Sequence, residues 1–163
     1  MNEDSKKLAI VTGAARGIGL ATALMFNENG YKVAIVDNDK KEIDNLSFKN
    51  ENLKTFCFDI SNDDELEKMY SQILKWHSRI DVLVNNAGVA DFGNIEETNF
   101  KRWNEVMKTN LNGVFLCSQK AISDLKKTKG NIINIASISG LRASTLRVAY
   151  GTSKAAVIQL TKQ

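Results

Sequence analysis

The sequence predicts a single doubly wound α/β domain, a parallel sheet with helices on both faces. Two observations predict it. Short apolar runs, typical of buried parallel strands, alternate with stretches of helical periodicity, and the first run leads into a glycine-rich turn that opens a helix. The length of 163 residues, 43% of them hydrophobic and 25% charged, suits one compact domain over residues 1–163.

The elements follow from the local pattern. Strands are predicted at 7–12, 31–37, 54–60, 80–85 and 130–136, and helices at 17–29, 40–50, 100–127 and 150–163. A further helix carries the apolar stripe Leu66, Met69, Tyr70, Ile73 and Leu74. Ser61 is predicted as its N-cap, with Asp64 at the capping-box position, and Thr98 is predicted to begin the long region 100–127.

Charge and composition argue against several classes of function. The net charge of +3 comes from 22 basic and 19 acidic residues in short runs, so no nucleic-acid or membrane footprint is predicted. No apolar stretch approaches the ~18 residues of a membrane span. The polar N-terminus is unlike a secretory signal, and a cytoplasmic location is expected.

Histidine and cysteine usage argues against hydrolases and metal sites. His77 is the single histidine, expected at the surface, and no G-x-S-x-G motif presents a nucleophile. A zinc site needs clustered ligands, so no metal is predicted. Cys57 and Cys117 lie in different apolar segments and are expected to be buried, reduced thiols.

The turn from Thr12 to Gly19 indicates phosphate binding. Its glycines, in the spacing G-x3-G-x-G, allow the backbone to approach a pyrophosphate at the positive end of the following helix. The Gly-Lys-Ser/Thr of a P-loop is absent, which argues against a phosphotransferase. A purely structural turn is the alternative interpretation.

Asp37 predicts which dinucleotide is bound. It ends the second strand, 18 residues after Gly19, where a carboxylate can hold both ribose hydroxyls of the adenosine and repel a 2′-phosphate. Arg16 argues for NADP instead, because a basic residue near the turn can pair with that phosphate. We favour NAD over NADP.

Tyr150 and Lys154 are four residues apart, on one face of the last predicted helix. An adjacent ammonium favours the phenolate form of a tyrosine, which makes it a usable base at neutral pH. Ser137 follows the fifth strand, 13 residues before Tyr150. Ligands bind at the C-terminal ends of strands in open α/β sheets, so these residues are expected at one crevice.

Together these motifs resemble the short-chain dehydrogenase/reductase family, from about Lys7 to Gln163. The resemblance implies an NAD(P)-binding Rossmann-type fold with the strand order 3-2-1-4-5. The family's glycine motif matches Gly13, Gly17 and Gly19, its adenine-pocket acid matches Asp59, and its N-N-A-G motif matches Asn85–Gly88. Its structural asparagine matches Asn110, and its catalytic residues match Ser137, Tyr150 and Lys154. The cofactor-binding residues expected are Gly13, Arg16, Gly17, Ile18, Gly19, Asp37, Asp59, Ile60, Asn86, Ala87, Gly88, Tyr150 and Lys154.

The resemblance implies hydride transfer between NAD(H) and a secondary alcohol or ketone. In that reading Tyr150 is the general acid/base, Ser137 hydrogen-bonds the substrate oxygen, and Lys154 holds the nicotinamide ribose. Asn110 positions a water that relays protons, although a helix kink is a structural alternative for it. A homo-oligomer, dimer or tetramer, is also implied.

The family's pattern continues beyond Gln163, with two more strands and a Pro-Gly segment that have no counterpart among these residues. We therefore expect a C-terminally truncated fold with an exposed edge at the fifth strand, weak cofactor binding at most and poor turnover. A non-catalytic NAD-binding or oligomerisation module is the alternative function. Arg142 and Arg147 border the expected substrate site; solvent or interface roles are favoured over anchoring a carboxylate or phosphate.

Overall fold

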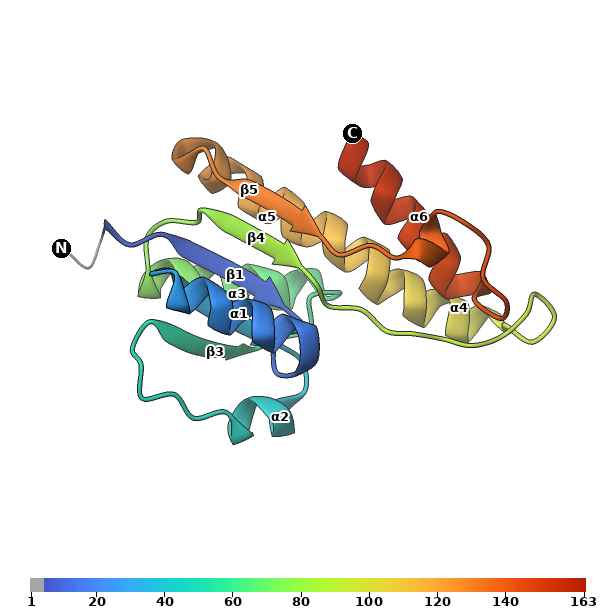
Figure 1. Ribbon diagram of the computed structural model, residues 1–163, viewed down its shortest axis with the longest axis horizontal. Coiled ribbons are helices and arrows are strands. Elements are labelled where there is room, and N and C mark those ends of the chain that lie inside the picture. Colours follow the sequence, from blue (N-terminus) through green and yellow to red (C-terminus); the bar gives the residue numbers. More distant parts are fainter. Residues whose placement is uncertain (1–4) are drawn as a thin grey trace.

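The computed structural model describes residues 5–163 and contains a five-stranded sheet with helices on both faces (Figure 1). The strand order is β3-β2-β1-β4-β5, and all neighbouring pairs are parallel, as predicted. The strands are β1 (Leu8–Thr12), β2 (Lys32–Asp37), β3 (Leu53–Cys57), β4 (Val82–Asn85) and β5 (Asn131–Asn134). Because they are parallel, their C-terminal ends lie along one edge of the sheet.

The helices are α1 (Gly17–Glu28), α2 (Lys40–Asn45), α3 (Asp63–Trp76), α4 (Phe100–Met107), α5 (Gly113–Thr128) and α6 (Val148–Lys162). A π-helix, η2 (Lys108–Asn112), joins α4 to α5, and a 3-10 helix, η3 (Ile138–Gly140), precedes α6. Within residues 5–163, no helix has the length and apolar character needed to span a bilayer.

The sheet separates two hydrophobic cores. Leu8 and Ile10 of β1 face the buried residues of α3 and α5, whereas Ala9 and Val11 face those of α1 and α2. Every residue of β1 is buried. A strand covered on both faces is a continuous apolar run in the sequence, which is why the run at 7–12 predicted it.

The residues that cap the N-termini of α3 and α4 differ from those predicted. Asn62, not Ser61, caps α3, and its Oδ1 accepts hydrogen bonds from the backbone N–H of Asp64 (3.1 Å) and of Glu65 (3.3 Å). The Ser61 hydroxyl instead donates to Asp59 (2.6 Å). Either side chain can cap a helix, so the short turn after β3 decides which of two adjacent residues does so.

The long region predicted at 100–127 is capped by Asn99 rather than Thr98. Asn99 accepts from the N–H of Arg102 (3.0 Å), while the Thr98 hydroxyl donates back to the carbonyl of Asn94 (2.7 Å). The region is also not one α-helix, because η2 widens it around Asn110. Such π-turns often lie at functional sites.

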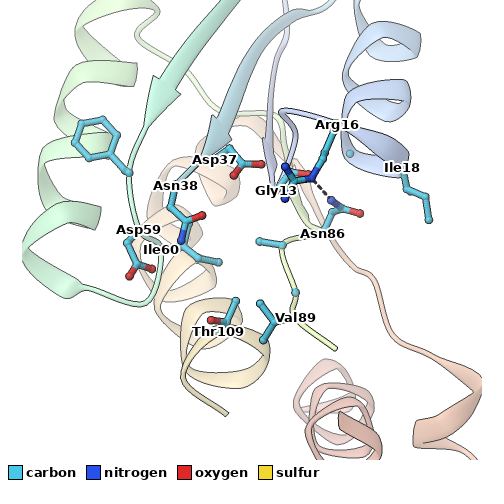
Figure 2. A pocket seen from close by; sticks show the side chains of 14 residues that line it. Gly13, Arg16, Ile18, Asp37, Asn38, Asp59, Ile60, Asn86, Val89 and Thr109 are labelled. Atoms are coloured by element: carbon cyan, nitrogen blue, oxygen red, sulfur yellow. Dashed lines mark hydrogen bonds between the residues drawn. The ribbon is translucent and has the colours of Figure 1, made fainter. Parts of the chain in front are cut away.

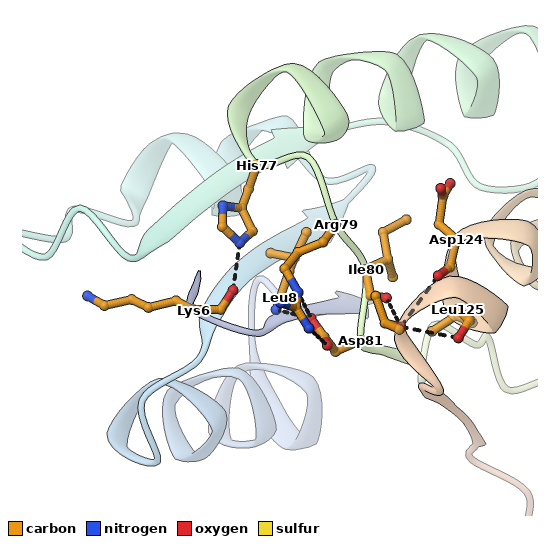
Figure 3. Close-up of polar contacts among 9 residues, drawn as sticks. Lys6, Leu8, His77, Arg79, Ile80, Asp81, Asp124 and Leu125 are labelled. Atoms are coloured by element: carbon orange, nitrogen blue, oxygen red, sulfur yellow. Dashed lines mark hydrogen bonds and ion pairs between the residues drawn. The ribbon is translucent and has the colours of Figure 1, made fainter. Parts of the chain in front are cut away.

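His77 is buried, and the expectation of a surface histidine is wrong. Its Nε2 donates to the carbonyl of Lys6 (2.7 Å), at the edge of the sheet opposite the C-terminal strand ends (Figure 3). Beside it, the buried carboxylate of Asp81 accepts from the N–H of Leu8 (2.9 Å) and from Arg79 Nε (2.8 Å). These contacts tie β1 to the start of β4.

The two thiols differ, so the expectation that both are buried is wrong for Cys57. Cys117 is fully buried in α5, and burial raises the pKa of its thiol to about 12. Cys57 is exposed because β3 is an edge strand in which Phe56 alone is buried. Both are free thiols.

Candidate functional site

A cleft of about 330 Å³ opens at the C-terminal ends of the strands (Figure 2). It brings together every predicted cofactor-binding residue except Gly17, Tyr150 and Lys154. It is lined by Gly13, Arg16, Ile18, Gly19, Asp37, Asn38, Phe58, Asp59, Ile60, Asn86, Ala87, Gly88, Val89 and Thr109.

The glycine turn packs against the segment after β4. Gly13 has a φ of +62°, and a Cβ there would lie 2.6 Å from the Cα of Ala87. A Cβ on Gly19 would overlap the carbonyl oxygen of Gly13 and lie 2.6 Å from Nδ2 of Asn86. Glycine at both positions is therefore required by backbone contacts, which leaves the floor of the cleft lined by main chain.

Asn86 and Thr12 hold this arrangement in place. Asn86 Nδ2 donates to the carbonyls of Thr12 (2.9 Å) and Gly13 (3.0 Å). The buried Thr12 hydroxyl accepts from the N–H groups of Asn86 and Ala87, both at 3.1 Å. The predicted motif residue Asn86 thus fixes the position of the turn.

The start of α1 carries no capping side chain. Its N-cap residue, Arg16, makes no side-chain cap bond, whereas Asp39, Asn62 and Asn99 cap α2, α3 and α4. No acidic residue lies in the first turn of α1. Uncapped N–H groups at a helix start can bind phosphate oxygens.

Carboxylates surround the Arg16 end of the cleft. Asp37 accepts from the N–H of Ala15 (3.1 Å) through Oδ2 and from that of Asp39 (3.0 Å) through Oδ1. The exposed Arg16 guanidinium pairs with Asp39 (3.0 Å) and lies 3.9 Å from Glu42. The N–H of Glu42 and the Arg16 guanidinium hold the pKa of Asp39 below its usual value.

Asp59 and Ile60 form the wall of the cleft after β3. The Asp59 carboxylate accepts from the N–H of Ser61 (2.9 Å) and lies 3.9 Å from Nζ of Lys108 on η2. Ile60 is buried, and a Cβ on Gly113 would lie 2.8 Å from its Cδ1. Gly113 therefore lets α5 pack against this wall.

Asn110 is fully buried where η2 meets α6. Its Oδ1 accepts from the N–H of Val89 (2.8 Å), and its Nδ2 donates to the carbonyl of Val89 (2.9 Å) and to Ser153 Oγ (3.1 Å). The side chain therefore connects the segment after β4 to α6. This geometry is consistent with a positioning role, and the π-helix around Asn110 is also consistent with the structural alternative of a helix kink.

Lys154 is buried with no carboxylate partner among residues 5–163. Its Nζ donates to the carbonyl of Ile135 (2.7 Å) and lies 5.9 Å from the ring centroid of Tyr150. A Cβ on Gly88 would lie 3.6 Å from this nitrogen and 3.3 Å from Oδ1 of Asn110. Lys154 and Asn110 therefore converge on the end of the cleft at Gly88.

Burial lowers the pKa of Lys154 below its usual value, because desolvation disfavours the charged form. Between the lowered pKa and ~10.4 the unfolded chain binds more protons than the folded one, so this residue's destabilising effect is relieved as pH rises. We expect the unfolding free energy of the wild type to increase relative to that of Lys154→Met between pH 7 and pH 10. A difference independent of pH, in urea unfolding, would contradict this.

Ser137 and Tyr150 come from two segments that pack closely. Ser137 Oγ accepts from the N–H of Ser139 (3.2 Å) at the start of η3. A Cβ on Gly140 would lie 2.6 Å from the backbone of Lys154, and one on Gly151 would lie 3.1 Å from the carbonyl of Ser139. These two glycines let the turn after β5 lie directly against the first turns of α6, which carry Tyr150.

Sequence reasoning missed four residues of the cleft: Asn38, Phe58, Val89 and Thr109. Each adjoins a predicted residue in the chain, so adjacency to a motif was the available signal. The close packing of Gly151 against Ser139 was not predicted either, because it depends on a contact between two different segments of the chain.

Comparisons with known proteins agree with this geometry. The family model described as "short chain dehydrogenase" matches residues 7–163. Meso-2,3-butanediol dehydrogenase from Serratia marcescens is 36% identical over 158 residues, 96% of this chain and 63% of that protein. The 3-oxoacyl-[acyl-carrier-protein] reductase FabG of Staphylococcus epidermidis (strain ATCC 12228 / FDA PCI 1200) is 37% identical over 162 residues, 96% of this chain and 66% of that protein.

A solved structure described as "ElxO with NADP Bound" superposes with a TM-score of 0.88 at 34% identity, over 95% of this chain and 65% of that one. The chain thus spans about two thirds of the length of the curated relatives it matches. The family match covers nearly all of the chain and the fold agrees. This chain belongs to the short-chain dehydrogenase family.

Proposed function

We propose that the protein is an oxidoreductase that transfers a hydride between NAD(H) and a secondary alcohol or ketone. One observation carries the proposal: Lys154 and Asn110, both buried, converge at Gly88 on the end of a cleft floored by glycine backbone. A desolvated ammonium near a tyrosine favours the phenolate form, which supports acid/base chemistry in addition to nucleotide binding. Both curated relatives described above also have names that refer to alcohol or ketone substrates.

The cleft fits a dinucleotide. Side chains at Gly13 and Gly19 would fill its floor, and the uncapped N–H groups of α1 are available to a pyrophosphate. Asp37, Asp59 and Ile60 would hold the adenosine half, whereas Gly88, Tyr150 and Lys154 would hold the nicotinamide half. When bound, the nicotinamide supplies the hydride donor or acceptor.

We propose NAD rather than NADP. This end of the cleft has three carboxylates, those of Asp37, Asp39 and Glu42, and one guanidinium. That guanidinium belongs to Arg16, which is already paired with Asp39. A 2′-phosphate would have to displace that pair and approach Asp37. The NADP-bound neighbour of known structure argues for the other cofactor, so the choice rests on these carboxylates.

Different residues of the chain would transfer the proton, stabilise the developing charge and position the catalytic groups. The Tyr150 hydroxyl donates a proton to the carbonyl oxygen during reduction and accepts it during oxidation. Ser137 Oγ donates a hydrogen bond to the same oxygen and stabilises the developing charge. Lys154 favours the phenolate form of Tyr150 through its positive charge. Asn110 holds Val89 and Ser153 in place through its side-chain hydrogen bonds.

A homo-oligomer is part of the proposal. Exposed apolar side chains occur along α4 and α5, at Phe100, Phe115 and Ile122. Such residues favour burial against a second copy of the chain.

Calorimetric titration with NADH and NADPH tests the cofactor assignment. We expect saturable binding with NADH preferred, and loss of that preference in Asp37→Asn. The amide oxygen can still accept from Ala15 N–H, whereas the charge and the acceptor for Asp39 N–H are lost. Asp44→Asn, on the exposed Lys40–Asp44 pair of α2, is the matched control and should leave the preference unchanged. Preference for NADPH in the wild type would contradict the assignment.

A further inference from the structure

Arg147 lies beside Tyr150 with its guanidinium over an aromatic ring. Its Cζ is 3.9 Å from the ring centroid of Phe92 and 5.3 Å from that of Tyr150. Arg147 is half-buried and immediately precedes α6. Stacking on a ring orients the guanidinium plane and leaves its N–H edge available to a planar anion.

No carboxylate neutralises Arg147 within residues 5–163. Arg16, Arg79 and Arg102 are paired with Asp39, Asp81 and Asp91 respectively, and no hydrogen bond or ion pair of the described part of the chain involves the Arg147 side chain. The acid nearest in sequence to Phe92 is Asp91, which Arg102 already holds through Nε (3.0 Å) and Nη2 (2.6 Å).

The backbone around Arg147 is fixed on both sides. The N–H of Gly93 donates to the carbonyl of Leu146 (3.0 Å), and the Gly93 carbonyl accepts from the N–H of Val148 (3.5 Å). The segment after β4, which carries Phe92, therefore pairs with the segment that precedes α6. Both partners of the stacked pair are held before any ligand arrives, which lowers the entropic cost of binding one.

The geometry points to Arg147 as a specificity-determining residue that binds the carboxylate of a short oxo or hydroxy acid, whose neighbouring carbonyl or hydroxyl meets Tyr150. This rests on the proposed function, because Tyr150 identifies where the reacting carbon lies. The guanidinium donates two parallel hydrogen bonds to the carboxylate. This role differs from the solvent or interface role that the sequence favoured for this arginine.

Arg142 is the matched control. It lies in the same segment between η3 and α6 and is exposed, and it contacts no aromatic ring among the described residues. It lines the same surface pocket as Arg147, of about 400 Å³, on the flank of α6. A general attraction of this pocket for anions would involve both arginines, whereas the proposed subsite involves Arg147 alone.

Chemical modification tests the subsite without turnover. Phenylglyoxal reacts with free guanidinium groups, and the modified residues are identified by mass spectrometry in the presence of NADH. We expect acetoacetate to protect Arg147 and leave Arg142 unprotected, and methyl acetoacetate to protect neither. Equal protection of both arginines, or equal protection by acid and ester, would overturn the proposal.

Kinetics provide the second readout. Arg147→Gln is expected to raise the KM for acetoacetate by roughly 10- to 100-fold, the loss typical of a charge-assisted hydrogen bond, with a smaller change for the methyl ester. Arg142→Gln should change neither. An equal change for acid and ester in Arg147→Gln overturns the subsite. If no ketone supports NADH oxidation, the proposed function fails instead, and the modification experiment still decides the binding role of Arg147.

Discussion

Replacing Tyr150 with phenylalanine is expected to lower the rate of ketone-dependent NADH oxidation by roughly 10²- to 10⁴-fold, the usual contribution of a general acid/base. The substitution removes one hydroxyl and keeps the ring that faces Arg147 and Lys154. Binding of NADH should change little, because the glycine turn and the Asp37 end of the cleft lie elsewhere. Single-turnover measurements with protein in excess over NADH can resolve even slow rates.

Tyr31→Phe is the matched control for this variant. Tyr31 precedes β2 and packs edge-on against Phe26 of α1, with ring centroids 5.1 Å apart, at the edge of the sheet away from the cleft. Its loss of a hydroxyl should leave the rate unchanged. An unchanged rate in Tyr150→Phe would remove that residue from the proposed chemistry.

Adding a single methyl group at Gly19 is expected to abolish detectable NADH binding. The Cβ of Gly19→Ala would overlap the Gly13 carbonyl and lie 2.9 Å from the Cα of Ala14. Overpacking of this kind costs roughly 1–3 kcal/mol, and relief requires the turn to move from the position in which it can approach a pyrophosphate. Calorimetry measures the binding, and urea unfolding measures the stability.

Gly30→Ala is the control that distinguishes loss of NADH binding through a displaced glycine turn from loss through general destabilisation. Gly30 has a φ of +86°, and nothing lies within 4 Å of a Cβ placed there, so its substitution costs backbone strain alone. It lies between α1 and β2, away from the cleft. We expect Gly30→Ala to lose stability and retain NADH binding. Loss of binding in both variants would mean that the Gly19 effect is general destabilisation.

Much of the fold could be predicted because its signals are local. The buried strand β1 is a short apolar run that ends at Thr12, and the turn that follows it carries Gly13 and Gly19 in a distinctive spacing. The parallel order then brings Asp37, Asn86 and Ser137 to one edge of the sheet. Motif order in the chain therefore predicted which residues meet, and the structure agrees for the cleft.

The remaining features depend on contacts that local sequence does not encode. Ser61 and Asn62 are equally able to cap α3, and only the turn after β3 selects Asn62. His77 is polar and ends a helix, yet the carbonyl of Lys6, distant in sequence, satisfies it in the interior. The guanidinium of Arg147 lies over the Phe92 ring because of a pairing between segments more than fifty residues apart.

The most direct test of the proposed activity follows deuterium from 4-deuterated NADH into the product alcohol, with mass spectrometry as the readout and both faces of the nicotinamide labelled in separate samples. We predict that the wild type transfers deuterium from one face to the carbonyl carbon of a ketone, and that Tyr150→Phe transfers almost none. Saturable NADH binding with no deuterium in any alcohol would contradict the proposed activity and would identify the chain as a nucleotide-binding module.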